Sequence, residues 1–85
     1  MKKQIKEFKM DKEKIIEIIA EKLNVKESLV TPEANFMRNL GADSLDLIEL
    51  MIAFEDAFDI DIHDEDVQHI RTVQETLDYL EKAGV

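Results

Sequence analysis

The sequence predicts an all-α fold, a four-helix bundle with three longer helices, a short third helix and a long ordered loop between the first two. Three observations predict it. The 85 residues include two Gly, one Pro and no Cys, which favours helix over sheet and excludes disulfides and thiol catalysis. Apolar residues recur at spacings of three and four, and capping residues precede these runs. Because so short a chain builds one core, residues 1–85 are expected to form a single domain.

The first helix is expected at about 11–24, where Asp11 can cap a run of isoleucines at helical spacing. Residues 1–10 form an N-terminal extension with two alternative interpretations. They prolong the helix, since Ile5 and Phe8 fit its apolar stripe, or they fray.

The segment 25–43 has no sustained helical period, yet it is too apolar for a free linker, so we expect an ordered loop that packs against the core. Its apolar residues are Leu29, Val30, Phe36, Met37 and Leu40. Thr31 and Pro32 suit the cap and first position of a single helical turn. Gly41 permits a left-handed turn before the next helix.

The second helix is expected at about 44–58, capped by Asp43 or Ser44, and it carries two apolar surfaces. The stripe expected to face the core consists of Leu47, Leu50, Met51, Phe54 and Phe58. The second strip consists of Leu45, Ile48 and Ile52. A small bundle leaves the second strip partly exposed, which makes it a candidate contact surface.

The third and fourth helices follow a short connector. Residues 58–62 alternate like a strand, but no second strand signal exists to pair with them, so an extended connector is expected. A short helix at about 64–70 comes next. The last helix opens with a capping box at 72–75 and ends before Gly84.

The net charge of −9 is concentrated in one part of the chain. Between residues 43 and 66 there is no Lys or Arg, and the acidic residues are Asp43, Asp46, Glu49, Glu55, Asp56, Asp59, Asp61, Asp64, Glu65 and Asp66. Such a field repels nucleic acid and anionic membranes and favours basic protein partners. Without a long apolar run, we expect no membrane insertion and, most simply, a cytoplasmic monomer.

The residues do not favour an enzyme or a defined metal site. The two histidines, His63 and His69, lie well downstream of Ser44, and the residues around Ser44 do not form a nucleophile elbow. An EF-hand beginning at Asp59 would need Gly and Glu where Asp64 and Ile70 stand. What remains is loose divalent-cation binding by clustered carboxylates.

Ser44 alone would be interpreted as a helix cap. The start of a helix nevertheless favours an attached anion, although Asp43 and Asp46 partly cancel that effect. The stretch 40–46, Leu-Gly-Ala-Asp-Ser-Leu-Asp, is similar to the phosphopantetheine attachment motif of acyl carrier proteins, and the resemblance runs from about residue 15 to 79.

This resemblance implies a non-catalytic carrier of growing fatty acyl chains. A phosphopantetheinyl transferase would attach 4′-phosphopantetheine from coenzyme A to Ser44, flanked by Asp43 and Leu45, and fatty acid synthesis enzymes would act on the thioesters. Arg38-Asn39 stands where many members are acidic, and His63 replaces a frequent proline. These departures affect partner preference and loop stiffness rather than attachment.

Two further sets of residues are expected to serve this role. The partner-binding surface would comprise Asp46, Ile48, Glu49, Ile52, Glu55 and Asp56. By resemblance, an acyl-chain pocket would be lined by Ile48, Leu50, Ile52 and Phe54. Two alternatives remain open: a carrier for polyketide, peptidyl or D-alanyl transfer, and an acidic helical adaptor in which Ser44 is only a cap. The acidic second helix favours the fatty-acid type.

Overall fold

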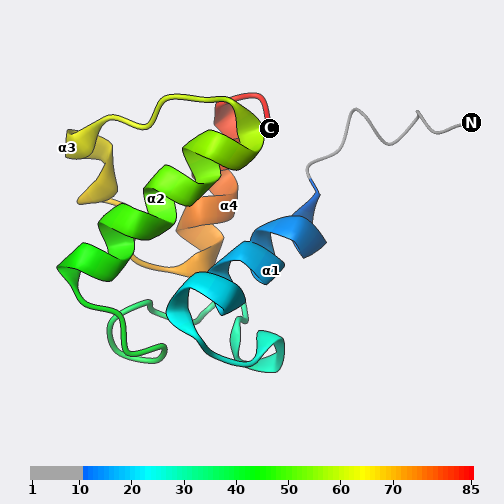
Figure 1. Ribbon diagram of the computed structural model, residues 1–85, viewed down its shortest axis with the longest axis vertical. Helices are drawn as coiled ribbons and strands as arrows, with labels where there is room; N and C mark the ends of the chain where they lie inside the picture. Colours follow the sequence, from blue (N-terminus) through cyan, green and yellow to red (C-terminus); the bar gives the residue numbers. More distant parts are fainter. Residues whose placement is uncertain (1–10) are drawn as a thin grey trace, which may run out of the picture.

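The computed structural model describes residues 11–85, in which the regular elements are helices and no strand occurs, as predicted. The expected N-terminal extension, 1–10, lies outside the described residues. The helices are α1 (Lys12–Leu23), α2 (Ser44–Phe58), α3 (Asp64–Val67) and α4 (Val73–Lys82), with one 3-10 turn, η2 (Glu27–Leu29). In Figure 1, α2 lies in front of α4, α1 lies beside them, and the α1–α2 loop closes the lower end.

The first helix confirms the predicted bounds and cap. The backbone N–H of Lys14 donates to the Asp11 side chain at 3.1 Å. Asn24 ends the helix in the left-handed conformation, with φ of 58°. Ile15 and Ile19 are fully buried, so the apolar stripe of α1 faces the core as its spacing indicated.

The loop between α1 and α2 packs as predicted at three of its five apolar positions. Val30, Phe36 and Leu40 are buried, whereas Leu29 and Met37 are 53% and 49% exposed. The prediction is wrong for these two because a loop lying over a core has an outer surface, and apolarity alone does not say which residues face outward.

The prediction of a helical turn at Thr31-Pro32 is wrong, because the turn that forms there is not helical. The N–H of Ala34 donates to the Thr31 carbonyl at 3.0 Å, closing a turn without a helix, and the loop's helical turn is η2 instead. Beyond this turn the chain extends alongside the start of α4. There the N–H of Val73 donates to the carbonyl of Ala34, also at 3.0 Å.

Helix α2 has the two apolar surfaces that its periodicity predicted. Leu47, Leu50, Met51 and Phe54 are buried, and Phe58 is partly buried with its ring 6.3 Å from that of Phe54. Leu45, Ile48 and Ile52 are 60%, 50% and 49% exposed. The core therefore covers one side of α2 and leaves the other to solvent.

Helix α3 is shorter than the predicted 64–70, because the chain tightens after Val67. The N–H of Ile70 donates to the Val67 carbonyl at 3.1 Å, three residues back, as in a 3-10 turn. This tightening keeps Ile70 in the core at 3% exposure. Burial of Ile70, rather than helix propensity, accounts for the shape of this segment.

Tyr79, the chain's one tyrosine, joins α4 to α3, because its hydroxyl donates to Asp66 Oδ2 at 2.8 Å. Burial, followed by the bond to Asp66, raises the pKa of the Tyr79 phenol above its ordinary value of about 10. The unfolded chain loses this proton at lower pH than the folded chain. The stabilisation is therefore complete below about pH 10 and is lost as the pH rises through the folded-state pKa.

We expect Tyr79→Phe to lower the free energy of unfolding by about 1 kcal/mol near neutral pH, and the deficit to shrink above about pH 10. Urea unfolding across this range measures the deficit. Absorbance titration of the phenolate measures the pKa of Tyr79 directly, because no second tyrosine contributes. A phenolate that forms at or below the ordinary pKa would contradict the prediction.

Candidate functional site

Ser44 is the first residue of α2, and the capping of this helix is done by its neighbours. The N–H of Asp46 donates to Asp43 Oδ1 at 2.9 Å, and the N–H of Asp43 donates to Asp46 Oδ2 at 3.1 Å. This reciprocal pair is a capping box. Of the two caps that the sequence allowed, Asp43 is therefore the one used. The Ser44 side chain is exposed, and its hydroxyl is not needed to start the helix.

The loop before α2 delivers Ser44 to the surface. Leu40 and Ala42 are buried, and the N–H of Ala42 donates to the Phe36 carbonyl at 2.9 Å, which anchors the chain on both sides of Gly41. Gly41 has a φ of 75°, the left-handed conformation predicted for it. Space around Gly41 is open, so the backbone conformation, not crowding, is what requires glycine there.

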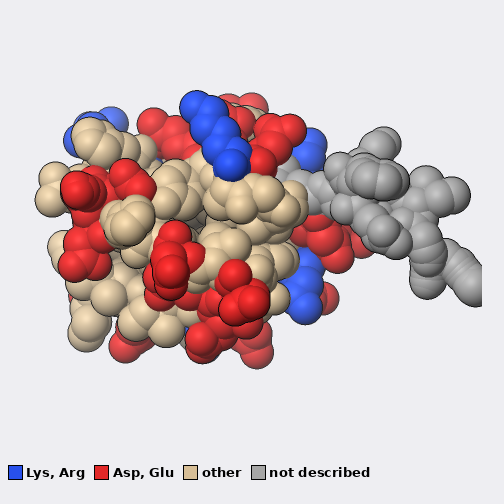
Figure 2. Space-filling view, turned by 90° about the horizontal axis from the view of Figure 1, so that it is seen from above, with Lys and Arg blue, Asp and Glu red and all other residues tan. Residues whose placement is uncertain are grey.

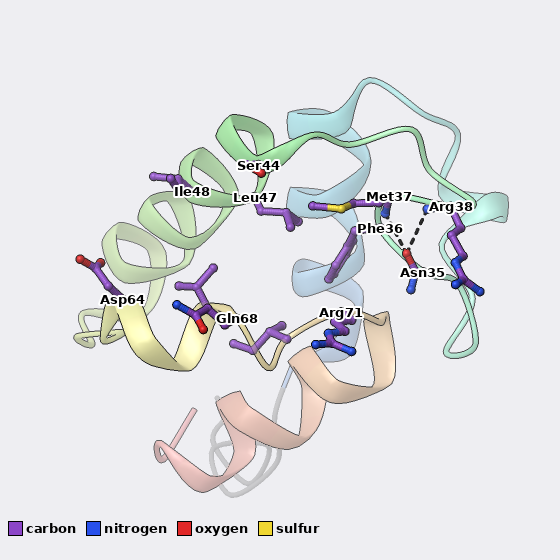
Figure 3. Close-up of a pocket in the computed structure, with 12 residues that line it drawn as sticks. Asn35, Phe36, Met37, Arg38, Ser44, Leu47, Ile48, Asp64, Gln68 and Arg71 are labelled. Atoms are coloured by element: carbon purple, nitrogen blue, oxygen red, sulfur yellow. Dashed lines mark hydrogen bonds between the residues drawn. The ribbon is translucent and has the colours of Figure 1, made fainter.

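A cavity of about 770 Å³ opens beside Ser44, between the α1–α2 loop, α2, α3 and the segment before α4 (Figure 3). Its lining residues are Asn35, Phe36, Met37, Arg38, Ser44, Leu47, Ile48, Asp64, Val67, Gln68, Ile70 and Arg71. The apolar members come from all four of these elements. The cavity therefore has an apolar wall, a hydroxyl at the start of α2 and charged groups around it.

The lining expected for an acyl chain has to be corrected for this cavity. Of the four residues, Ile48 lines it. Leu50 and Phe54 are fully buried in the core, and Ile52 lies on the exposed strip. The expected set combined residues from both sides of α2, whereas a cavity on one side of a helix receives residues from that side and from neighbouring elements.

The residues expected to bind partners lie on α2, and most are exposed. Ile48, Glu49, Ile52 and Asp56 are exposed. Asp46 belongs to the capping box. Glu55 is partly buried and accepts a hydrogen bond from the N–H of Ile62 at 2.8 Å, so it holds the α2–α3 connector against the helix. Seen from the end of the molecule where this connector lies, acidic side chains outnumber basic ones (Figure 2).

Several lining residues were not among the predicted site residues, most notably Met37, Gln68 and Arg71. No local pattern marks them, because they reach the cavity through contacts between segments distant in sequence. His63 and His69 do not line it. Within residues 11–85, no group of three or more potential ligands is arranged to hold a metal ion. No helix in this range is long and apolar enough to cross a membrane.

A phosphodiester-linked arm fits the residues present. The Ser44 hydroxyl is exposed and released from capping, and the first turn of α2 offers unpaired backbone amides and the positive end of the helix dipole. The neighbouring cavity has an apolar wall against which a flexible arm or its cargo can lie. The carboxylates of Asp43 and Asp46 oppose a phosphate there, but each already accepts a backbone N–H.

Comparisons with known proteins agree with this geometry. The family model described as a phosphopantetheine attachment site matches residues 13–80. An acyl carrier protein of Syntrophobacter fumaroxidans (strain DSM 10017 / MPOB) is 55% identical over 69 residues, which cover 81% of this chain and 85% of the relative. An acyl carrier protein of Syntrophus aciditrophicus (strain SB) is 51% identical over 73 residues, 86% of this chain and 91% of that protein.

Proposed function

The chain belongs to the acyl carrier proteins, whose prosthetic group is 4′-phosphopantetheine and whose cargo is fatty acyl chains, and we propose that Ser44 is its attachment residue. One observation carries the proposal for Ser44. It is the serine within the matched segment that begins a helix with an exposed hydroxyl, while Asp43 performs the capping. Asp43 and Leu45 flank the attachment point and shape the surface that a modifying enzyme must recognise.

The described residues act by presenting and shielding rather than by catalysis. When bound, the arm supplies a thiol that carries acyl groups as thioesters, which the chain cannot do itself because it has no cysteine. Helix α2 holds the Ser44 oxygen at a fixed place on the surface, and its first-turn amides face an attached anion. Within residues 11–85, neither histidine lines the cavity beside Ser44, so we expect the transferase to supply the base that removes the hydroxyl proton.

Partner enzymes are proposed to dock on the exposed side of α2. The apolar strip of Leu45, Ile48 and Ile52 lies within about two helical turns of Ser44, with Glu49 and Asp56 exposed beside it. An acidic edge beside an apolar strip complements a basic patch around an apolar centre. Because each exposed ion pair contributes about 0–1 kcal/mol, such docking is weak and releases quickly, as a shuttling carrier requires.

The acidic surface and the size of the chain also bear on its oligomeric state and its partners. We propose that residues 1–85 act as one non-catalytic carrier domain that works as a monomer in the cytoplasm. Its partners would be a phosphopantetheinyl transferase and fatty acid synthesis enzymes with basic docking surfaces. The acidic surface supports partners of this charge and disfavours nucleic acid. Analytical ultracentrifugation of the loaded protein tests the monomer.

Incubation with coenzyme A and a phosphopantetheinyl transferase tests the function. The intact mass should rise by one phosphopantetheine, and acyl groups should then be carried as hydroxylamine-sensitive thioesters. An acidic adaptor in which Ser44 serves no prosthetic group would keep its mass. The acyl groups on protein isolated from its own cells distinguish a fatty acid carrier from one that serves polyketide, peptidyl or D-alanyl transfer.

Charge reversal at Glu49 is expected to weaken docking without affecting the fold. Glu49 is exposed on α2, and Glu49→Lys replaces attraction to a basic patch with repulsion. We expect the KM of partner enzymes for the loaded carrier to rise roughly 3- to 10-fold, with the difference shrinking at high salt.

Glu17→Lys on the exposed side of α1 makes the same charge change away from α2 and serves as the matched control. Steady-state kinetics with several partners, together with circular dichroism, would separate docking from folding. Equal KM values for the two variants would contradict a docking surface on α2.

A further inference from the structure

Both arginines of the chain line the cavity beside Ser44. Between residues 27 and 81 the sequence contains many acidic residues, but Arg38 and Arg71 are its two basic residues. They lie far apart along the chain, yet both line the same cavity. Two of the chain's eleven Lys and Arg residues therefore lie at one cavity of a molecule whose net charge is −9, which favours a ligand of opposite charge there.

Backbone contacts hold the two segments that carry the arginines side by side. The N–H of Phe36 donates to the Arg71 carbonyl at 3.0 Å, and Asn35 forms an isolated bridge with Thr72. The N–H of Arg38 donates to Asn35 Oδ1, also at 3.0 Å. The N–H of Arg71 donates to the Glu75 carboxylate. These bonds use backbone atoms of both arginines, so replacement of either side chain leaves the connections intact.

Basic and acidic side chains lie at different ends of the cavity. Figure 3 shows Ser44 on α2 at one edge, Arg71 across the cavity on the segment before α4, Arg38 on the loop at one end beyond Asn35, and Asp64 at the opposite end on α3. Phe36, Met37 and Leu47 lie between Ser44 and the arginines. A flexible group attached at Ser44 would cross this apolar middle and meet a basic edge on one side and an acidic group on the other.

We propose that Arg38 and Arg71 form a carboxylate-binding edge that retains acyl chains ending in a carboxylate. This inference rests on the proposed attachment of the arm at Ser44. The phosphodiester remains next to Ser44, at a different edge of the cavity from both guanidinium groups, and the pantetheine beyond it is neutral. The anion that can reach the edge is therefore on the cargo, and Asp64 repels it from the opposite end.

Guanidinium groups suit this ligand. Each presents a planar fork of donors that matches the two oxygens of a carboxylate. Both side chains are exposed, so the gain per pair is modest, and two pairs next to an apolar wall are needed for a measurable preference. A monocarboxylic acyl chain of the same length would bury its methyl end against Phe36 and Leu47 but would make no bond to either arginine.

Carriers loaded with three matched cargoes test the proposal: hexanoyl, adipoyl and the monomethyl ester of adipoyl. Intact mass verifies each loading. In the wild type we expect the adipoyl carrier to melt ~3–6 °C above the methyl ester carrier, because the two exposed ion pairs together shift the melting of so small a domain by a few degrees. In the Arg38→Gln/Arg71→Gln variant the two should melt together. Arg38→Lys/Arg71→Lys should restore part of the difference.

A second measurement, the pKa of the distal carboxyl group of the cargo, tests directly whether this group lies near the arginines. With ¹³C at the distal carboxyl, we expect the pKa of the adipoyl carboxyl group to be lower on the wild type than on the glutamine variant, because nearby cations favour the charged form. Lys12→Gln/Lys14→Gln, which removes two exposed charges from α1, is the matched control and should leave both readouts unchanged.

The outcomes separate this inference from the proposed function. Failure of every protein to gain mass would reject attachment at Ser44 itself. Successful loading with equal melting of adipoyl and methyl ester carriers would overturn the carboxylate edge. A loss of stability in the glutamine variant that is equal for all three cargoes would also overturn it. If the glutamine variant already loses stability when the arm carries no acyl group, the arginines would be contacting the phosphodiester, and the proposal would be rejected as well.

Discussion

Ser44→Ala is expected to abolish the mass increase with coenzyme A and a phosphopantetheinyl transferase, while the protein stays folded. The variant lacks the oxygen to which a phosphodiester can be attached, so the expected loss is complete. Stability should change by less than about 0.5 kcal/mol, because the residue is exposed, alanine is a good helix former and Asp43 supplies the cap. Intact mass and thermal unfolding measure the two effects separately.

Asp43→Ala is the informative control for this experiment. It removes the side chain that accepts the N–H of Asp46, so it should destabilise the protein by about 0.5–2 kcal/mol yet retain the acceptor hydroxyl of Ser44. A mass increase in the Ser44→Ala variant would reject Ser44 as the attachment residue. Unfolding of that variant would mean that the serine side chain does stabilise the start of α2.

Phe54→Ala is expected to lower the free energy of unfolding by about 3–5 kcal/mol. Phe54 is fully buried at the centre of α2 and packs against Phe58. Its truncation loses apolar burial and leaves a cavity that the surrounding helices fill only in part. For a domain of this size the total stability is about 4–13 kcal/mol, so this loss removes a large fraction of it.

Ile52→Ala on the same helix provides the contrast. Ile52 is 49% exposed, so its truncation should cost less than about 1 kcal/mol of stability but should weaken partner docking. Urea unfolding of both variants and kinetics with one partner enzyme distinguish the two sides of α2. Similar stability losses at the two positions would show that the exposed strip is buried in the folded protein.

Elements whose signals are local were predicted well from the sequence. Asp11 and the capping box at 72–75 start their helices as expected, because a cap is a contact between residues three positions apart. The two surfaces of α2 follow from the helical repeat alone. Ser44 was identified from its flanking motif, since by itself it is only a residue at the start of a helix.

The bounds of α3 and the conformation of the α1–α2 loop depended on contacts between distant segments. Burial of Ile70 shortened α3, and the turn at Thr31 stays a single non-helical turn after which the loop extends along the start of α4. Neither effect appears in a local pattern, since the energy of a tertiary contact outweighs the small propensity differences between neighbouring backbone conformations.

The sequence by itself therefore determined where the three longer helices lie, the exposed acidic and apolar side of α2 and the serine proposed for modification, because short-range spacing and a local motif encode them. Tertiary structure alone decided which residues surround that serine. The cavity, its apolar wall and the presence of both Arg38 and Arg71 in its lining arise where the α1–α2 loop is bonded to the segment before α4. The physical reason is that a cavity is bounded by elements distant along the chain, and their approach depends on the packing of the whole core.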